Sequence, residues 1–219
     1  MNEQIEKTDV KTPKATRKDI HLPRRLFHLT MGVGSGTIYA LFLTHNQAVY
    51  ILGTCACLLY IFEQVRLNYP EYSGTLSRVT KYFLRAEEQL KESASIPFVM
   101  GLLLTILTFP KSVSLVAIYT LAISDPLSAI IGIKFGRTRI VPHKSLEGSL
   151  AFFLSCFCII CFVYSPYLET KSWTLLFVAF AVSFSVSVFE MLPIKLDDNL
   201  TIPIFSAVTM WLAQTLLLL

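Results

Sequence analysis

The segment Ser112–Ile133, SVSLVAIYTLAISDPLSAIIGI, decides the fold, because it is a long apolar run with an acid near its middle. Its length matches the roughly 20 residues that an α-helix needs to cross a bilayer. An ionised carboxylate at that depth costs roughly 2.5–3.5 kcal/mol on insertion scales, unless a counter-charge, an ion or a water-lined cavity receives it. Pro126 follows Asp125 and removes a backbone donor, so we expect a broken membrane helix. Such a helix predicts a site for a cation or a metal–phosphate complex.

The composition of the whole chain supports a membrane protein. Of its 219 residues, 53% are hydrophobic and only 16% are charged, whereas a soluble domain carries about 25% charged residues. Seven apolar segments recur, of which the second and third are short: Leu26–Leu43, Gln47–Phe62, Ala94–Phe109, Ser112–Ile133, Gly148–Tyr164, Trp173–Leu192 and Ile202–Leu219. The sequence therefore predicts an all-α integral membrane protein of about seven transmembrane helices. We expect a polar cytoplasmic segment over 1–23 and one polytopic domain over 24–219.

The distribution of basic residues predicts the orientation. With seven spans, all of the 19 lysines and arginines except Lys111 and Lys171 fall on the side of the N-terminus. Because basic residues collect in cytoplasmic loops, we expect a cytoplasmic N-terminus and an external C-terminus. Apolar residues at helical spacing in Thr75–Glu92 predict an interfacial amphipathic helix. The net charge of +4 is modest, and no basic surface with stacking aromatics lies outside the apolar segments, so we expect no nucleic-acid binding.

Three segments carry residues suited to chemistry. After Asp125 come small residues, and then glycines and cations at the cytoplasmic exit: Ser128, Ala129, Gly132, Lys134, Gly136, Arg137 and Lys144. Glycine lets backbone amides turn toward an anion, and the cations neutralise it. Gly148-Ser149 then opens the fifth apolar segment, whose helix N-terminus favours anions. Taken alone, the basic loop is more typical of the ordinary flank of a membrane helix; combined with Asp125, it favours a metal-bound polyphosphate.

The second segment is Asp197-Asp198-Asn199, between the last two apolar segments. Neighbouring carboxylates repel each other, and a divalent cation keeps both ionised. The alternative is a hydrated loop in which Asp198 or Asn199 caps the last helix. Glu190 adds a further acid at or near membrane depth.

The third segment is Arg24-Arg25-Leu26-Phe27-His28, at the start of the first apolar segment. Its histidine is suited to bind phosphate or to transfer a proton. By itself the segment is more typical of an interfacial side chain that reaches out of the membrane.

Together these segments resemble the signature of the CTP-dependent lipid-alcohol kinases. That family groups dolichol kinase, phytol and farnesol kinases and the yeast-type diacylglycerol kinase, and it is distantly related to phosphatidate cytidylyltransferase. The resemblance covers about residues 24 to 210, and its most specific blocks are Lys144-Ser145-Leu146-Glu147-Gly148-Ser149 and Asp197-Asp198-Asn199-Leu200-Thr201-Ile202-Pro203. Pro126 departs from the pattern, because a small residue is expected after Asp125.

The resemblance implies phosphoryl transfer from CTP to a lipid hydroxyl, with Mg²⁺, at the cytoplasmic face of the membrane. That membrane is the inner membrane in a bacterium or the endoplasmic reticulum membrane in a eukaryote. The implied metal ligands are Asp125, Asp197 and Asp198, and the implied phosphate clamp is Lys134, Arg137 and Lys144. Gly136 and Gly148 would allow backbone approach, and Ser145 and Asn199 are also implied to bind the nucleotide. Glu147 would orient Lys144 or join the metal ligands, and the base would be His28 or an aspartate.

The acceptor is implied only as a class: polyprenol or dolichol, a phytol-like alcohol, or diacylglycerol. Two other functions stay open at this point. One is synthesis of a CDP-lipid by a cytidylyltransferase, which would use a similar metal–CTP site. The other is non-catalytic transport of ions or lipids, with Asp125 and Glu190 as an ion path.

Overall fold

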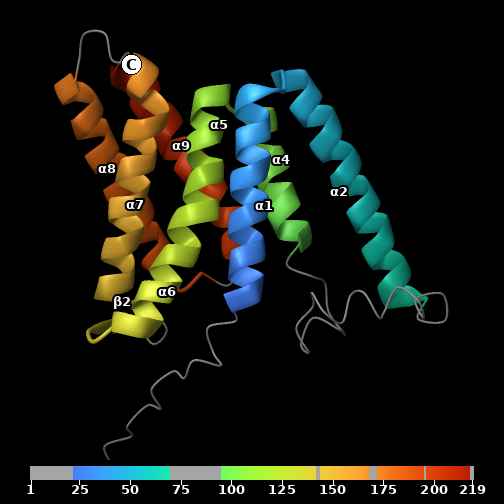
Figure 1. The fold of residues 1–219 in the computed structure, drawn as a ribbon, viewed down its shortest axis with the longest axis horizontal. Coiled ribbons are helices and arrows are strands. Elements are labelled where there is room, and N and C mark those ends of the chain that lie inside the picture. Colours follow the sequence, from blue (N-terminus) through green and yellow to red (C-terminus); the bar gives the residue numbers. More distant parts are fainter. Residues whose placement is uncertain (1–21, 70–94, 142–143, 168–171, 195, 218–219) are drawn as a thin grey trace, which may run out of the picture.

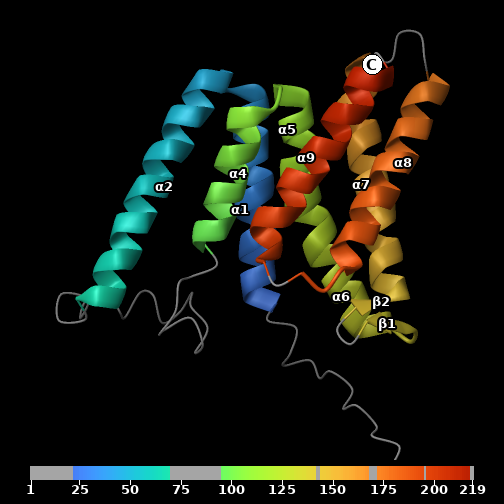
Figure 2. The same ribbon diagram turned by 180° about the vertical axis from the view of Figure 1, so that it is seen from behind.

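The protein is an all-α bundle, as the sequence predicts. The computed structural model of the chain describes residues 22–69, 95–141, 144–167, 172–194 and 196–217. The helices are α1 (Leu22–Leu41), α2 (His45–Asn68), α4 (Ser95–Thr108), α5 (Lys111–Tyr119), η3 (Thr120–Ser124), α6 (Asp125–Phe135), α7 (Leu146–Tyr164), η4 (Ser165–Tyr167), α8 (Ser172–Met191) and α9 (Asp198–Leu217). They run roughly along one direction, and α2 leans away at one edge (Figures 1 and 2).

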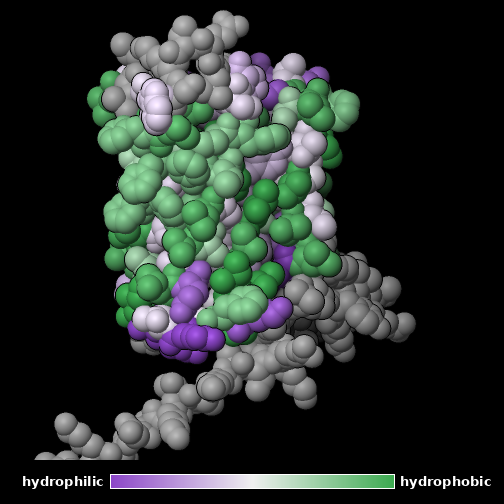
Figure 3. Space-filling model, turned by 60° about the vertical axis from the view of Figure 1, so that its left-hand side comes forward, coloured by the Kyte–Doolittle hydropathy of each residue, from purple (hydrophilic) through white to green (hydrophobic). Residues whose placement is uncertain are grey.

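Each of the seven predicted apolar segments falls on a helix with similar bounds. Within the described residues, four helices are long and apolar enough to cross a membrane: His45–Asn68, Lys111–Phe135, Leu146–Tyr164 and Trp173–Met191. A space-filling view of one side shows a broad apolar band with hydrophilic residues toward the ends (Figure 3). The membrane class is therefore confirmed. The number of spans, their orientation and the domain bounds stay predictions, and the amphipathic helix expected at Thr75–Glu92 lies outside the described residues.

The central element of the bundle is the segment that decides the fold. Helix α5 packs against α1, α4, α7 and α9, and its residues Val113, Val116 and Ala117 are fully buried. The core around it is built from large apolar side chains of the neighbouring helices, such as Phe152 of α7 and Met210 of α9. This burial explains why the segment is apolar on all sides, since it faces protein on most of its surface.

The helix is not broken at Asp125-Pro126, and here our expectation is wrong. A π-helical turn, η3 (Thr120–Ser124), joins α5 to α6 without a break, and the Asp125 amide donates to the carbonyl of Thr120, five residues back. A π-turn adds one residue to the helical repeat. The helix can therefore accommodate Pro126, which has no backbone amide to donate. Such turns are frequent at functional sites, and this one places Asp125 at the start of α6.

A small hairpin, which the sequence did not predict, connects α6 to α7. Strands β1 (Arg139–Val141) and β2 (Lys144–Ser145) pair antiparallel with an irregular register. The Ser145 side chain then caps α7 by accepting the Gly148 amide at 3.2 Å. The hairpin and the cap together fix the backbone position from which the Lys144 side chain extends.

Candidate active site

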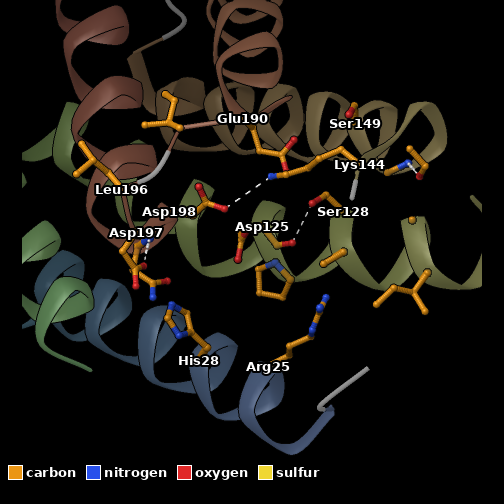
Figure 4. A pocket seen from close by; sticks show the side chains of 18 of the residues that line it. Arg25, His28, Asp125, Ser128, Lys144, Ser149, Glu190, Leu196, Asp197 and Asp198 are labelled. Atoms are coloured by element: carbon orange, nitrogen blue, oxygen red, sulfur yellow. Dashed lines mark hydrogen bonds and ion pairs between the residues drawn. The ribbon is translucent and has the colours of Figure 1, made fainter. Parts of the chain in front are cut away.

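A cavity of about 640 Å³ opens at one end of the bundle. It lies where α1 begins, α6 and α8 end, and α7 and α9 begin, at the lower end of Figure 1. Figure 4 shows Asp125 and Asp198 in the middle, Lys144 and Glu190 on one wall, and Arg25 and His28 of α1 on the opposite wall. Acids and cations from segments far apart in sequence therefore meet in one place.

Most of the residues predicted for the site line this cavity. They are His28, Asp125, Lys144, Ser145, Gly148, Asp197, Asp198 and Asn199. They come from all three sequence segments, which the structure thus brings together. Arg25, Arg139, Glu190 and Ser149 also line it and were not in the predicted set.

Four predicted residues do not line the cavity: Lys134, Gly136, Arg137 and Glu147. Lys134 and Arg137 are exposed, and the Lys134 ammonium lies 5.1 Å from the centre of the Phe135 ring. The Glu147 carboxylate accepts the backbone amides of Arg137 at 3.0 Å and Thr138 at 3.2 Å. It therefore ties the end of α6 to the start of α7, and its partner is not Lys144. Phosphate binding by the two cations stays a prediction.

Lys144 is the best-positioned cation of the cavity. Its ammonium forms an ion pair with Glu190 and lies 3.7 Å from a carboxylate oxygen of Asp198. Burial lowers the pKa of Lys144, but the charges of Glu190, Asp198 and Asp125 outweigh that effect, so the pKa is raised. The side chain is therefore a permanent positive charge at neutral pH.

Glu190 is an acid that the sequence places at or near membrane depth but that we did not assign to the kinase site. It lies at the end of α8, is only 5% exposed, and faces the cavity. The signal was present, because an acid at membrane depth needs a cation and is a functional candidate by default. Its cation, Lys144, lies 46 residues away in sequence, so the pair was not visible there.

The two adjacent aspartates have different surroundings. Asp197 accepts the Asn199 amide at 2.9 Å and so caps α9, a role that the alternative interpretation gave to Asp198 or Asn199. Asp198 is left about half exposed at the cavity, beside Lys144. Asp197 therefore caps the helix, whereas the Asp198 carboxylate stays exposed to the cavity.

The residues present fit a magnesium ion that arrives with a nucleotide better than a metal site made by protein alone. Among the described residues, no group of three or more His, Cys, Asp or Glu side chains is close enough to hold a metal ion. Mg²⁺ usually uses one or two carboxylates together with substrate phosphates and water. Asp125 and Asp198, which line the same cavity, supply such a pair.

Small residues hold the walls of the cavity together. At Gly148 a Cβ atom would lie 2.8 Å from the Ser128 carbonyl oxygen and 3.2 Å from the Gly132 Cα. Glycine at this position thus allows α6 and α7 to approach closely.

His28 on α1 is held edge-on to Phe98 of α4, with ring centres 4.2 Å apart.

Comparison with known proteins identifies several relatives. The chain is 26% identical to CTP-dependent diacylglycerol kinase 1 of Saccharomyces cerevisiae, over 86% of this chain and 72% of that protein. It is 25% identical to CTP-dependent diacylglycerol kinase 1 of Schizosaccharomyces pombe, over 89% of this chain and 94% of that protein. Phytol kinase 1, chloroplastic, of Arabidopsis thaliana is 28% identical over 88% of this chain and 66% of its own length.

No protein-family model and no solved structure matches the chain. The relatives nevertheless cover 86–89% of it, and their names agree with the resemblance drawn from the motifs. These relatives support a CTP-dependent lipid kinase family for the chain, which is similar to them at 25–28% identity over most of its length.

Proposed function

We propose that this protein transfers the γ-phosphate of CTP to the hydroxyl of a membrane lipid alcohol, with Mg²⁺, at the cytoplasmic face of the membrane. One observation carries the proposal: the acids and cations of three separate sequence segments line a single cavity at the polar end of an apolar bundle. The kinase relatives described above support the same reaction.

The cavity offers what phosphoryl transfer requires. The reaction depends on positioning and on neutralisation of charge more than on covalent chemistry by the protein. Lys144, Arg25 and Arg139 supply positive charge along the cavity walls. The N-terminal turns of α7 and α9 also reach the cavity, and helix N-termini favour anions.

Asp125 and Asp198 are the residues that would hold Mg²⁺. The ion, when bound, would neutralise negative charge on the phosphates. Asp198 lies 3.7 Å from the Lys144 ammonium. His28 and Asp125 are the candidates for the group that accepts the proton of the lipid hydroxyl, since both line the cavity.

Diacylglycerol is the first acceptor to test, because relatives from two yeasts carry that name. A phytol-like alcohol is the second, on the name of the plant relative. Apolar side chains of Ile133, Ile194 and Leu196 line the cavity beside its charges. They provide a surface for the first carbons of a lipid tail while the hydroxyl meets the polar residues.

The deciding experiment uses the purified full chain in lipid nanodiscs with γ-labelled CTP and a panel of lipid alcohols. We expect the label to appear on the lipid, with diacylglycerol tested against phytol and polyprenol. Label released as pyrophosphate from a phosphatidate substrate would instead indicate a cytidylyltransferase. Solute flux in liposomes without any nucleotide dependence would indicate a transporter.

A further inference from the structure

Glu190 is a buried acid to which the proposed reaction gives no role. One of its carboxylate oxygens accepts from Lys144, and the other is buried without a hydrogen-bond partner among the described residues. A buried polar atom without a partner is unfavourable, so its retention at a cavity wall calls for an explanation. The residue belongs to α8, which packs along α7 and α9. The backbone position of Glu190 is therefore well fixed.

The backbone that carries Lys144, by contrast, packs less firmly than a helix does. It lies on the two-residue strand β2, and its side chain is about a quarter exposed (27%). Lysine has a flexible four-carbon stem and a compact charge, so it can point in many directions. In this structure Glu190 holds the ammonium inside the cavity, while Asp198 at 3.7 Å is a second and more exposed partner.

Stability alone does not account for the pair. Burying two charges costs several kcal/mol per ion, and their attraction offsets this only with very good geometry. An apolar pair of similar volume would often serve the fold as well. A functional use of the pair is therefore the better explanation.

We infer that Glu190 is a positioning residue, which holds the Lys144 ammonium at the one place in the cavity where it meets the phosphates of the nucleotide. The inference rests on the proposed function and adds to it the residue that fixes its central cation. Without Glu190, the ammonium should move toward Asp198, its remaining partner.

The test is a double-mutant cycle on the full chain in nanodiscs, with Lys144→Met, Glu190→Gln and the double variant. Glu190→Gln should lower kcat about ten- to a hundredfold, the range for groups that orient a ligand. Its KM for CTP should change by no more than about threefold, because losing a negative charge offsets the misplaced cation. In the Lys144→Met background, Glu190→Gln should lower kcat no further.

The matched control is Glu63→Gln. Glu63 is also a buried glutamate paired with a basic residue, Arg66, but it lies on α2 and does not line the cavity. Its kcat and KM should stay within about twofold of wild type. If Glu190→Gln lowers kcat by the same factor with and without Lys144, the residue has only a structural role and the inference is overturned.

Two further measurements separate this inference from the proposed function. Calorimetric titration of wild type with CTP, and thermal unfolding of the four proteins of the cycle, need no lipid acceptor. Protein that binds CTP but phosphorylates no alcohol would refute the kinase function. The inference would then stand if Lys144→Met weakens CTP binding at least tenfold and Glu190→Gln restores the stability that Lys144→Met removes. It would fall if either effect is missing, or if wild type binds no CTP.

Discussion

Replacing Gly148 by alanine should separate α6 and α7, two neighbouring helices that both line the cavity. The new Cβ would lie 2.8 Å from the Ser128 carbonyl oxygen and 3.2 Å from the Gly132 Cα, whereas ordinary contacts are 3.4–4 Å. Both neighbours are backbone atoms of α6, so no side-chain rotation can relieve the overlap. Overpacking of this kind costs about 1–3 kcal/mol. The melting temperature should fall by roughly 2–4 °C for each kcal/mol in a chain of this size.

The same change should reduce activity more than stability. Asp125 lies three residues before Ser128 on α6, and Lys144 leads into α7, so separating the helices moves both. A misplacement of about 1 Å can lower a rate about a hundredfold. The measurements are thermal unfolding in nanodiscs and the γ-labelled CTP assay on the same preparation.

Gly53→Ala is the matched control, because a Cβ there would meet nothing within 4 Å. Alanine in a helix is favoured over glycine, so this variant should be unchanged or stabilised by up to about 1 kcal/mol. If Gly148→Ala is as stable and as active as Gly53→Ala, the close approach of α6 and α7 does not hold the site together.

Three other predictions test the chemistry. Asp125→Asn and Asp198→Asn should each keep the helical circular dichroism spectrum but lose at least about a hundredfold in kcat, since each removes a charge at the reacting centre; wild-type turnover would remove that residue from the site. EDTA should abolish CTP turnover and added Mg²⁺ should restore it; turnover in metal-free buffer would contradict the role of the ion. The raised pKa of Lys144 means that its pairing stabilises the fold fully below the ordinary lysine value of 10.5 and is lost only as pH rises through the higher folded-state value. The Lys144 amine of wild type should therefore stay protonated between about pH 7 and about pH 9, which the NMR chemical shift of its isotope-labelled Nζ checks; loss of the proton in this window would contradict the raised pKa.

Sequence alone predicts most of the fold because the bilayer constrains it so strongly. A helix that crosses hydrocarbon must be apolar and about 20 residues long, and both properties can be counted. The predicted segment Ser112–Ile133, for example, lies wholly within the observed helical run Lys111–Phe135. The hairpin β1–β2 was missed, since strands of three and two residues are too short to show any periodicity.

Local backbone detail was harder to predict because neighbouring helices decide it. Pro126 removes one donor whatever surrounds it, but whether the helix breaks or takes up a π-turn depends on packing around Thr120–Ser124. For the cap at the start of α9 the sequence interpretation named Asp198 or Asn199, whose capping propensity is similar to that of Asp197. The structure assigns it to Asp197, which leaves Asp198 at the cavity.

The charge balance of the cavity bears on how a nucleotide can bind. Among the residues that the structure describes, four acids line it, Asp125, Glu190, Asp197 and Asp198, beside three cations, Arg25, Arg139 and Lys144. Like charges at short range repel, so a triphosphate beside these acids needs cations between them. Divalent cations bound to the phosphates would give Asp125 and Asp198 a partner, so the acids in the cavity are themselves an argument that the nucleotide binds as its metal complex.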